Sequence, residues 1–149
     1  MKHFIKILFS ALLVSTASTV GAHEGGHPGS PGSEHGKLCP VFFSLADVCA
    51  KVEFVKGPAQ EGESQFLVEF FEHKSAHGEH IPVDPQELKI DLWMYMGNHG
   101  GHGSAPVQWQ QQSAGVYMVT EAYFVMPGRW NVRFFVNGEQ ADLIVDVKP

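Results

Sequence analysis

From residue 52 onward, apolar residues recur at every second position in a series of short segments, and this pattern constrains the fold more than any other feature. A period of two places successive side chains on opposite faces of an extended strand, so each such segment predicts a half-buried strand. Long stretches with the helical period of about 3.6 residues are missing, and only 44–50 suggests a single helical turn. The alternation predicts seven strands, over 52–54, 66–70, 90–96, 107–109, 116–125, 130–136 and 143–147.

Turn signals separate these segments. Gly57-Pro58 ends the first, and Asn137-Gly138 is typical of a tight hairpin between the last two. The alternation slips near Glu121, which indicates a bulge in the fifth segment. One sheet alone would leave half of the apolar positions in water, so the pattern predicts an all-β chain folded as an immunoglobulin-like β-sandwich of about seven strands.

The amino-terminal segment has the layout of a signal peptide. Lys2 and Lys6 precede an uncharged run over 7–20, and Val20-Gly21-Ala22 is a small-residue processing site. We therefore expect residues 1–22 to be removed and the protein to be periplasmic or secreted. No later segment reaches the roughly 20 apolar residues that a membrane span requires, so we expect no span after processing.

A change of composition follows the leader. Residues 23–37 are dominated by Gly, Pro and Ser and include no large apolar residue, so they predict a flexible His/Gly/Pro arm. From residue 38 onward the composition is that of a folded domain, which we place at 38–149. Cleavage after Ala22 would give His23 both an imidazole and a free α-amino group.

The charge balance and the cysteines restrict the function further. Ten basic residues against sixteen acidic ones give a net charge of −6, which argues against a nucleic-acid partner because such a partner requires a basic surface. In an exported chain, Cys39 and Cys49 favour one structural disulfide over a thiolate metal site or free thiols.

Eight histidines follow the leader, and they fall in three clusters within predicted loops or the arm. Each is most simply a solvated polar residue, but their number and clustering favour a metal ligand role. The first cluster lies in the arm, the second between the second and third predicted strands, and the third directly after the third strand: His23, His27 and His35; His73, His77 and His80; His99 and His102.

Methionines beside the third cluster indicate which metal. Met94 and Met96 lie two residues apart on one predicted strand, so they face the same way, and Met126 could approach the same end from another strand. Thioethers suit Cu(I) and imidazoles suit both copper states, so a site built from Met94, Met96, Met126, His99 and His102 predicts copper, with Cu(I) favoured over Cu(II). The competing hypothesis is core packing, especially for Met94, whose alternation partners are apolar.

A family resemblance rests on the same region. The stretch LWMYMGNHGGHGSAPV, followed by GVYMVTEAYFVMPGRWNVRFFV, resembles the core of the YtkA-like/FixH-like periplasmic domains over roughly 52–148. Their pattern is a Trp-Met-Pro-x-Met-Gly-His loop, then Gly-x-Tyr, then Met-x-Gly-x-Trp. The resemblance implies a small immunoglobulin-like domain, similar in style to CopC-like copper carriers, with ligands at Met96 and at His99 or His102. An amino-terminal His23 is similar to the amino-terminal copper(II) ligand of CopC-like proteins.

These features predict an exported protein that sequesters copper or delivers it to a receiving envelope protein. We expect no enzymatic activity, because the chain lacks a nucleophile elbow, a phosphate-binding loop and a zinc-binding HExxH helix. Two alternatives remain open. One is a non-metal interaction module that uses exposed Trp93, Tyr95 and Phe135; the other is zinc or nickel bound by His73, His77 and His80.

Overall fold

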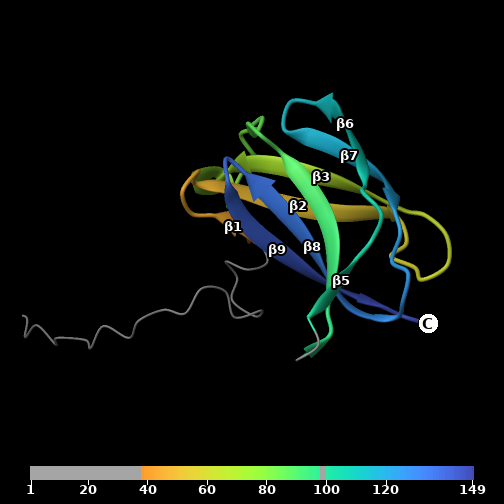
Figure 1. Ribbon diagram of the computed structural model, residues 1–149. Coiled ribbons are helices and arrows are strands. Elements are labelled where there is room, and N and C mark those ends of the chain that lie inside the picture. The colour runs from red at the N-terminus through yellow and green to blue at the C-terminus, as the bar shows by residue number, and fades with distance from the viewer. Residues whose placement is uncertain (1–37, 98–99) are drawn as a thin grey trace, which may run out of the picture.

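The computed structural model describes residues 38–97 and 100–149. These residues form two antiparallel sheets that pack face to face (Figure 1). The first sheet has the strand order β1-β2-β3-β7-β6 and the second has the order β5-β4-β8-β9. The strands are β1 Val41–Phe43, β2 Val48–Lys56, β3 Ser64–Glu72, β4 Lys89–Tyr95, β5 Gly101–Gly103, β6 Gln108–Ser113, β7 Val116–Ala122, β8 Gly128–Val136 and β9 Glu139–Val147.

This topology confirms the predicted immunoglobulin-like sandwich. The order β2-β3-β7-β6 repeats the ABED sheet of immunoglobulin domains, and β5-β4-β8-β9 repeats their CFG sheet with one added edge strand. The strand count is nine within the described residues, against the seven predicted. The two that the alternation missed, β1 and β5, have three residues each, too few to display a period. The predicted leader (1–22) and arm (23–37) lie outside the described residues.

Aromatic side chains from both sheets fill the space between them. The Phe70 ring of β3 meets Tyr117 edge-on in its own sheet, at a centroid distance of 5.7 Å, and Phe134 of the opposite sheet at 6.4 Å. Trp130 is fully buried, packs edge-on against Phe124 at 5.6 Å, and donates its indole N–H to the Met126 carbonyl. These contacts fix which face of each strand lies inward.

The segment 44–50 is not the helical turn that the sequence suggested. It forms the turn between β1 and β2 and the start of β2. The Glu139 carboxylate accepts hydrogen bonds from the Ser44 and Leu45 N–H groups at 2.8 and 2.9 Å, and Asp47 adopts a left-handed conformation (φ 52°). A side chain distant in the sequence therefore satisfies donors that a helix would leave free at its first turn.

The predicted hairpin at Asn137-Gly138 and the predicted irregularity near Glu121 both agree with the structure. Asn137 and Gly138 both have positive φ (52° and 82°) and join β8 to β9 through a two-residue hairpin. The fifth predicted strand ends at Ala122 rather than at 125, and its alternation is interrupted at Glu121, which has a φ of 55°.

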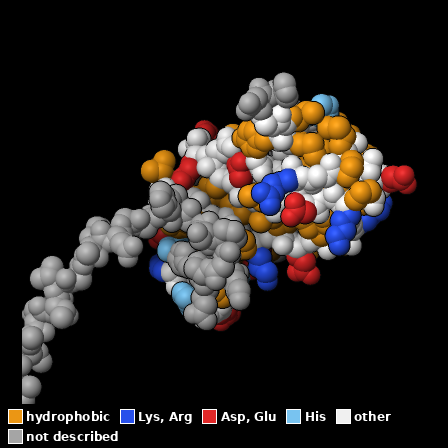
Figure 2. Space-filling view, turned by 90° about the horizontal axis from the view of Figure 1, so that it is seen from below, with side chains coloured by type: hydrophobic (Ala, Val, Ile, Leu, Met, Phe, Trp, Pro, Cys, Tyr) orange, Lys and Arg blue, Asp and Glu red, His pale blue; other side chains and the backbone are white. Residues whose placement is uncertain are grey.

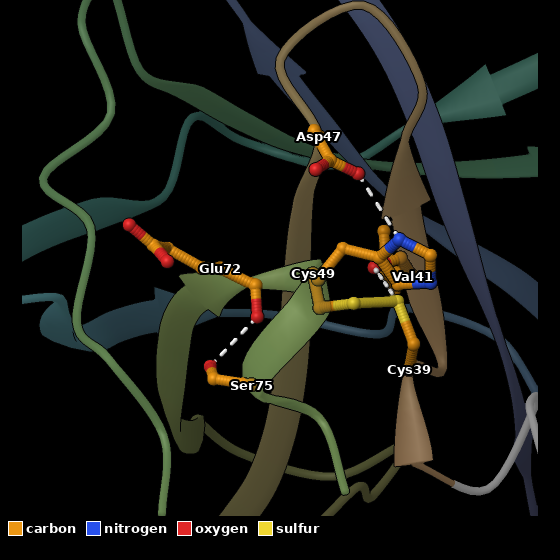
Figure 3. Close-up of a disulfide and its surroundings, with 7 residues drawn as sticks. Cys39, Val41, Asp47, Cys49, Glu72 and Ser75 are labelled. Carbon is orange, nitrogen blue, oxygen red and sulfur yellow. Dashed lines mark hydrogen bonds and ion pairs between the residues drawn. A yellow bond between two sulfur atoms is a disulfide. The ribbon is translucent and has the colours of Figure 1, made fainter.

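Cys39 and Cys49 form a disulfide whose Cα atoms are 5.2 Å apart (Figure 3). Together with Phe71 and Ala76 they make a small buried cluster outside the main core. The bridge attaches the segment before β1 to β2, next to the short 3-10 helix His73–Ser75. It links the segment before β1 covalently to the second strand of the sheet.

We expect the Cys39→Ser/Cys49→Ser variant to lose about 3 kcal/mol of unfolding free energy, because the bridge restricts a short loop in the unfolded chain. Urea denaturation of the oxidised wild type and the variant measures this loss. The wild type under reducing conditions should match the variant, and an unchanged midpoint in both comparisons would contradict a structural role.

A second prediction concerns Glu139. Desolvation opposes ionisation of its carboxyl, but hydrogen bonds from the Leu45 and Ser44 N–H groups and from the Ser44 hydroxyl outweigh this and lower its pKa. A lowered folded-state pKa stabilises the protein above the unfolded pKa of about 4.3, and this contribution is lost as pH falls through the folded value. The stability difference between wild type and Glu139→Gln should therefore be largest near neutral pH and shrink in acid.

The matched control is Glu53→Gln at an exposed position of β2. Urea denaturation across the acidic range measures both variants. A difference for Glu139→Gln that stays constant across this range would show that ionised Glu139 does not stabilise the turn.

Candidate metal site at the β4–β5 end

The short strand β5 brings one histidine opposite a methionine. In the antiparallel ladder Met94 of β4 pairs with His102 of β5, and the Met96 N–H donates to the Gly100 carbonyl at 2.8 Å. Directly opposed residues of antiparallel strands share a face, and so do residues two apart. Met94, Met96 and His102 therefore lie on one face of the β4–β5 ribbon.

The methionines differ in their access to water. Met94 is 8% exposed and belongs to the main core, whereas Met96 is 47% exposed. Met126 packs against the same core from the loop before β8, and a Cβ at nearby Gly128 would lie 3.1 Å from the Met94 methyl carbon. Core packing thus describes Met94 well, while Met96 and the exposed His102 are available to a ligand.

The candidate donors at this end are thioethers and an imidazole, which are uncharged at neutral pH. Within 38–97 and 100–149, no group of three or more His, Cys, Asp or Glu side chains is arranged to hold a metal ion. Thioether and imidazole together suit Cu(I) better than calcium or magnesium, and the thioether offers little to zinc. The predicted ligands His99 and His23 lie outside the described residues.

Trp93 holds β5 in place from the opposite face. Its indole lies across Gly101 so closely that a Cβ there would collide with the ring nitrogen, and a Cβ at Gly103 would lie 3.3 Å from the ring. On the outer side the Arg133 guanidinium stacks over the indole at 4.5 Å. Gly101 and Gly103 therefore permit the indole to lie close against the backbone of β5.

A charged pair fixes the stack on Trp93. Arg133 donates to both carboxylate oxygens of Asp91, at 2.6 and 2.9 Å, and the hydrogen bond with Asp91 raises the pKa of Arg133. Bidentate pairs of this kind have a defined geometry. Asp91 thus holds Arg133, and Arg133 holds the Trp93 indole against β5, the edge strand that carries His102.

The structure corrects the prediction that Trp93, Tyr95 and Phe135 are all exposed. Trp93 is half-buried beneath Arg133, and Phe135 is half-buried with the Lys89 ammonium 4.9 Å from its ring centre. Only Tyr95 of the three is exposed, at 60%. Intramolecular cation–π contacts occupy the other two rings, so they offer less surface to a partner than the sequence suggested.

The second histidine cluster does not converge on a common point. His73 Nδ1 lies 3.0 Å from Asp47, and its ring is 4.5 Å from that of Phe42. His80 stacks flat on Phe71 at 3.7 Å, with its Nδ1 3.0 Å from Glu69. His77 is exposed. The described side chains therefore place His73 and His80 in separate structural contacts, which does not favour the zinc or nickel alternative.

Comparison with known proteins gives a family match and one fold-level likeness. A family model described as YtkA-like matches residues 46–135. No protein with a curated description matches this chain. The crystal structure of the Lin-41 filamin domain resembles the chain with a TM-score of 0.44 and 10% sequence identity, covering 65% of this chain and 91% of that one. Among the described residues, no helix has the length and apolar character to cross a membrane.

We expect Gly101→Ala to destabilise the protein by about 1–3 kcal/mol, because a methyl group there must displace the Trp93 indole. The matched control is Gly78→Ala, where an added Cβ meets no atom within 4 Å. Thermal unfolding measures stability, and near-ultraviolet circular dichroism reports on the indole environment. Equal effects of the two substitutions would contradict the role of Trp93 in holding β5.

Proposed function

We propose that this chain, which belongs to the YtkA-like family, is an exported copper-binding protein that holds Cu(I) at the β4–β5 end and passes it to a receiving envelope protein. Met96 and His102 are the principal described ligands in this proposal. Met94 and Met126 pack in or against the core next to this end and are secondary ligands in the proposal, and His99, which the sequence places in the same loop, completes the ligand set. His23 is a second, amino-terminal copper ligand that gathers the ion near the domain.

The observation that supports this proposal most directly is the pairing of Met94 with His102. It places an imidazole on the same face as the thioether of Met94 in β4 and that of Met96, which directly follows β4. Imidazole and thioether together are a ligand combination for copper and offer little to hard cations. An ordered edge strand also limits the entropy that the site loses when it binds an ion.

A carrier role agrees with the position of these ligands. Met96 is about half exposed and His102 is exposed, so an ion held between them stays accessible to a partner protein. Figure 2 shows hydrophobic side chains gathered on part of one face of the molecule. At the β4–β5 end, Tyr95 and Met96 are exposed apolar side chains close in the ribbon to His102, and exposed apolar surface favours contact with another protein. Export through the leader 1–22 would place the protein in the envelope.

A second candidate function is docking without a metal. The outer face of the second sheet exposes Tyr95 on β4 and Ile144 on β9, at 60% and 57%. Exposed large apolar side chains favour protein recognition. In this candidate the protein binds an envelope partner equally well with and without copper, and substitution of Tyr95 weakens that binding.

The copper proposal is tested by titrating the natively processed protein with Cu(I) against a competing chelator. Met96→Leu and His102→Asn should each weaken Cu(I) affinity by about tenfold or more, equivalent to about 1.4 kcal/mol, because each removes one ligand. Zn(II) affinity should be weak and insensitive to Met96→Leu, because thioethers contribute little to zinc.

Matched controls use the same residue types elsewhere in the fold. Met118→Leu changes a half-buried methionine of β7, and His77→Asn changes an exposed histidine near the disulfide. Neither should alter Cu(I) affinity. Wild-type affinity in both Met96→Leu and His102→Asn, with the fold intact, would defeat the proposed site.

A further inference from the structure

The two sheets end in four edge strands, and three of these are short or covered. β1 and β9 are edges of different sheets, but they lie beside each other and shield one another (Figure 1). β5 has only three residues. Native sandwiches protect their edges because an open strand is a template for pairing with another chain.

The fourth edge, β6, lacks most of these protections. Its sequence is Gln-Trp-Gln-Gln-Gln-Ser over Gln108–Ser113, and all six residues are exposed. The strand has no charged residue and no proline, the residue types that usually discourage pairing at an edge. It pairs with β7 on one side, and none of the described strands pairs with its other side.

Contacts on the inner side hold β6 as a regular strand. The Gln111 side-chain amide donates to Asp84 at 2.6 Å, and Asp84 also accepts from the Gly115 N–H at 2.7 Å. Trp109, 42% exposed, packs edge-on against Tyr117 at 5.6 Å. The register shifts between Gln111 and Ser113, so the regular part of the edge is 108–111. This segment is already extended before any partner arrives.

We propose that two copies of this chain pair through β6 in antiparallel fashion, about a twofold axis that passes next to Trp109. This register places Trp109 opposite its own copy on the inner face, and Gln108 opposite Gln110 twice on the outer face. Opposed aromatic residues stabilise antiparallel strand pairs. The register uses only the regular part of the edge.

The chemistry of β6 favours a second copy over a charged peptide. A glutamine amide carries both a donor and an acceptor, so a row of glutamines complements itself. A charged partner would find no opposite charge on this strand. Pairing at β6 also leaves the β4–β5 end free, because these segments lie at opposite ends of the view in Figure 1. One strand pair gives a small interface, so we expect a weak, concentration-dependent dimer.

Sedimentation of the natively processed protein from micromolar to millimolar concentration tests this inference. The wild type should shift from monomer toward dimer, and hydrogen exchange of the 108–111 amides should slow over the same range. Gln108→Lys/Gln110→Lys places lysines opposite one another in the proposed register, so the dissociation constant should rise roughly tenfold or more.

The matched control is Gln86→Lys/Gln140→Lys, which adds the same charge at exposed positions outside β6. It should dimerise like the wild type. A wild type that stays monomeric at millimolar concentration would overturn the inference. So would a β6 variant that dimerises normally, or a control variant that loses the dimer equally.

Discussion

The burial of one apolar face from each sheet against the other is the constraint on which the rest of this structure depends. Phe70 is an example of this packing, because its ring contacts Tyr117 within its own sheet and Phe134 of the opposite sheet. A slip of one residue in any of these strands would turn its buried side chains toward water. The registers of β3, β4, β7 and β8 are therefore specified together, and so are the positions of the loops that join them.

The candidate copper site follows from that constraint on β4. Alternation sends Met94 inward, where it is one of the core residues, and sends Trp93 outward. Trp93 then packs across the glycines of β5, and the residue between them, His102, falls opposite Met94. One strand thus supplies a thioether on its inner face and, on its outer face, the ring that positions the imidazole. In this account Asp91, Arg133 and Trp93 on the outer face have a structural role. Copper binding on the inner face depends on them because Trp93 positions the strand that carries His102.

The sequence was sufficient to predict the sandwich and several of its details, because alternation, the Asn137-Gly138 turn and the irregularity at Glu121 are local signals. β5 was missed because Gly-His-Gly is short and a poor strand sequence, and its extended form depends on pairing with β4 and on the close contact with Trp93. The segment 44–50 was predicted incorrectly because Glu139, far along the chain, binds its N–H groups. Likewise, no local pattern shows that His80 stacks on Phe71 or that His73 pairs with Asp47. For the candidate site, the sequence indicated Met94, Met96, Met126, His99 and His102 as a group and His23 as an amino-terminal ligand, and the metal-binding role of all six stays a prediction.

The central claim is that thioether and imidazole together bind copper at the β4–β5 end. X-ray absorption spectroscopy of the Cu(I)-loaded protein, natively processed and at one equivalent of copper, tests it most directly because it distinguishes sulfur from nitrogen and oxygen ligands. The disulfide between Cys39 and Cys49 leaves no free thiol among the described residues, so a sulfur signal would come from methionine. The account predicts a first coordination shell that contains both sulfur and imidazole nitrogen. A shell of nitrogen and oxygen alone would contradict it.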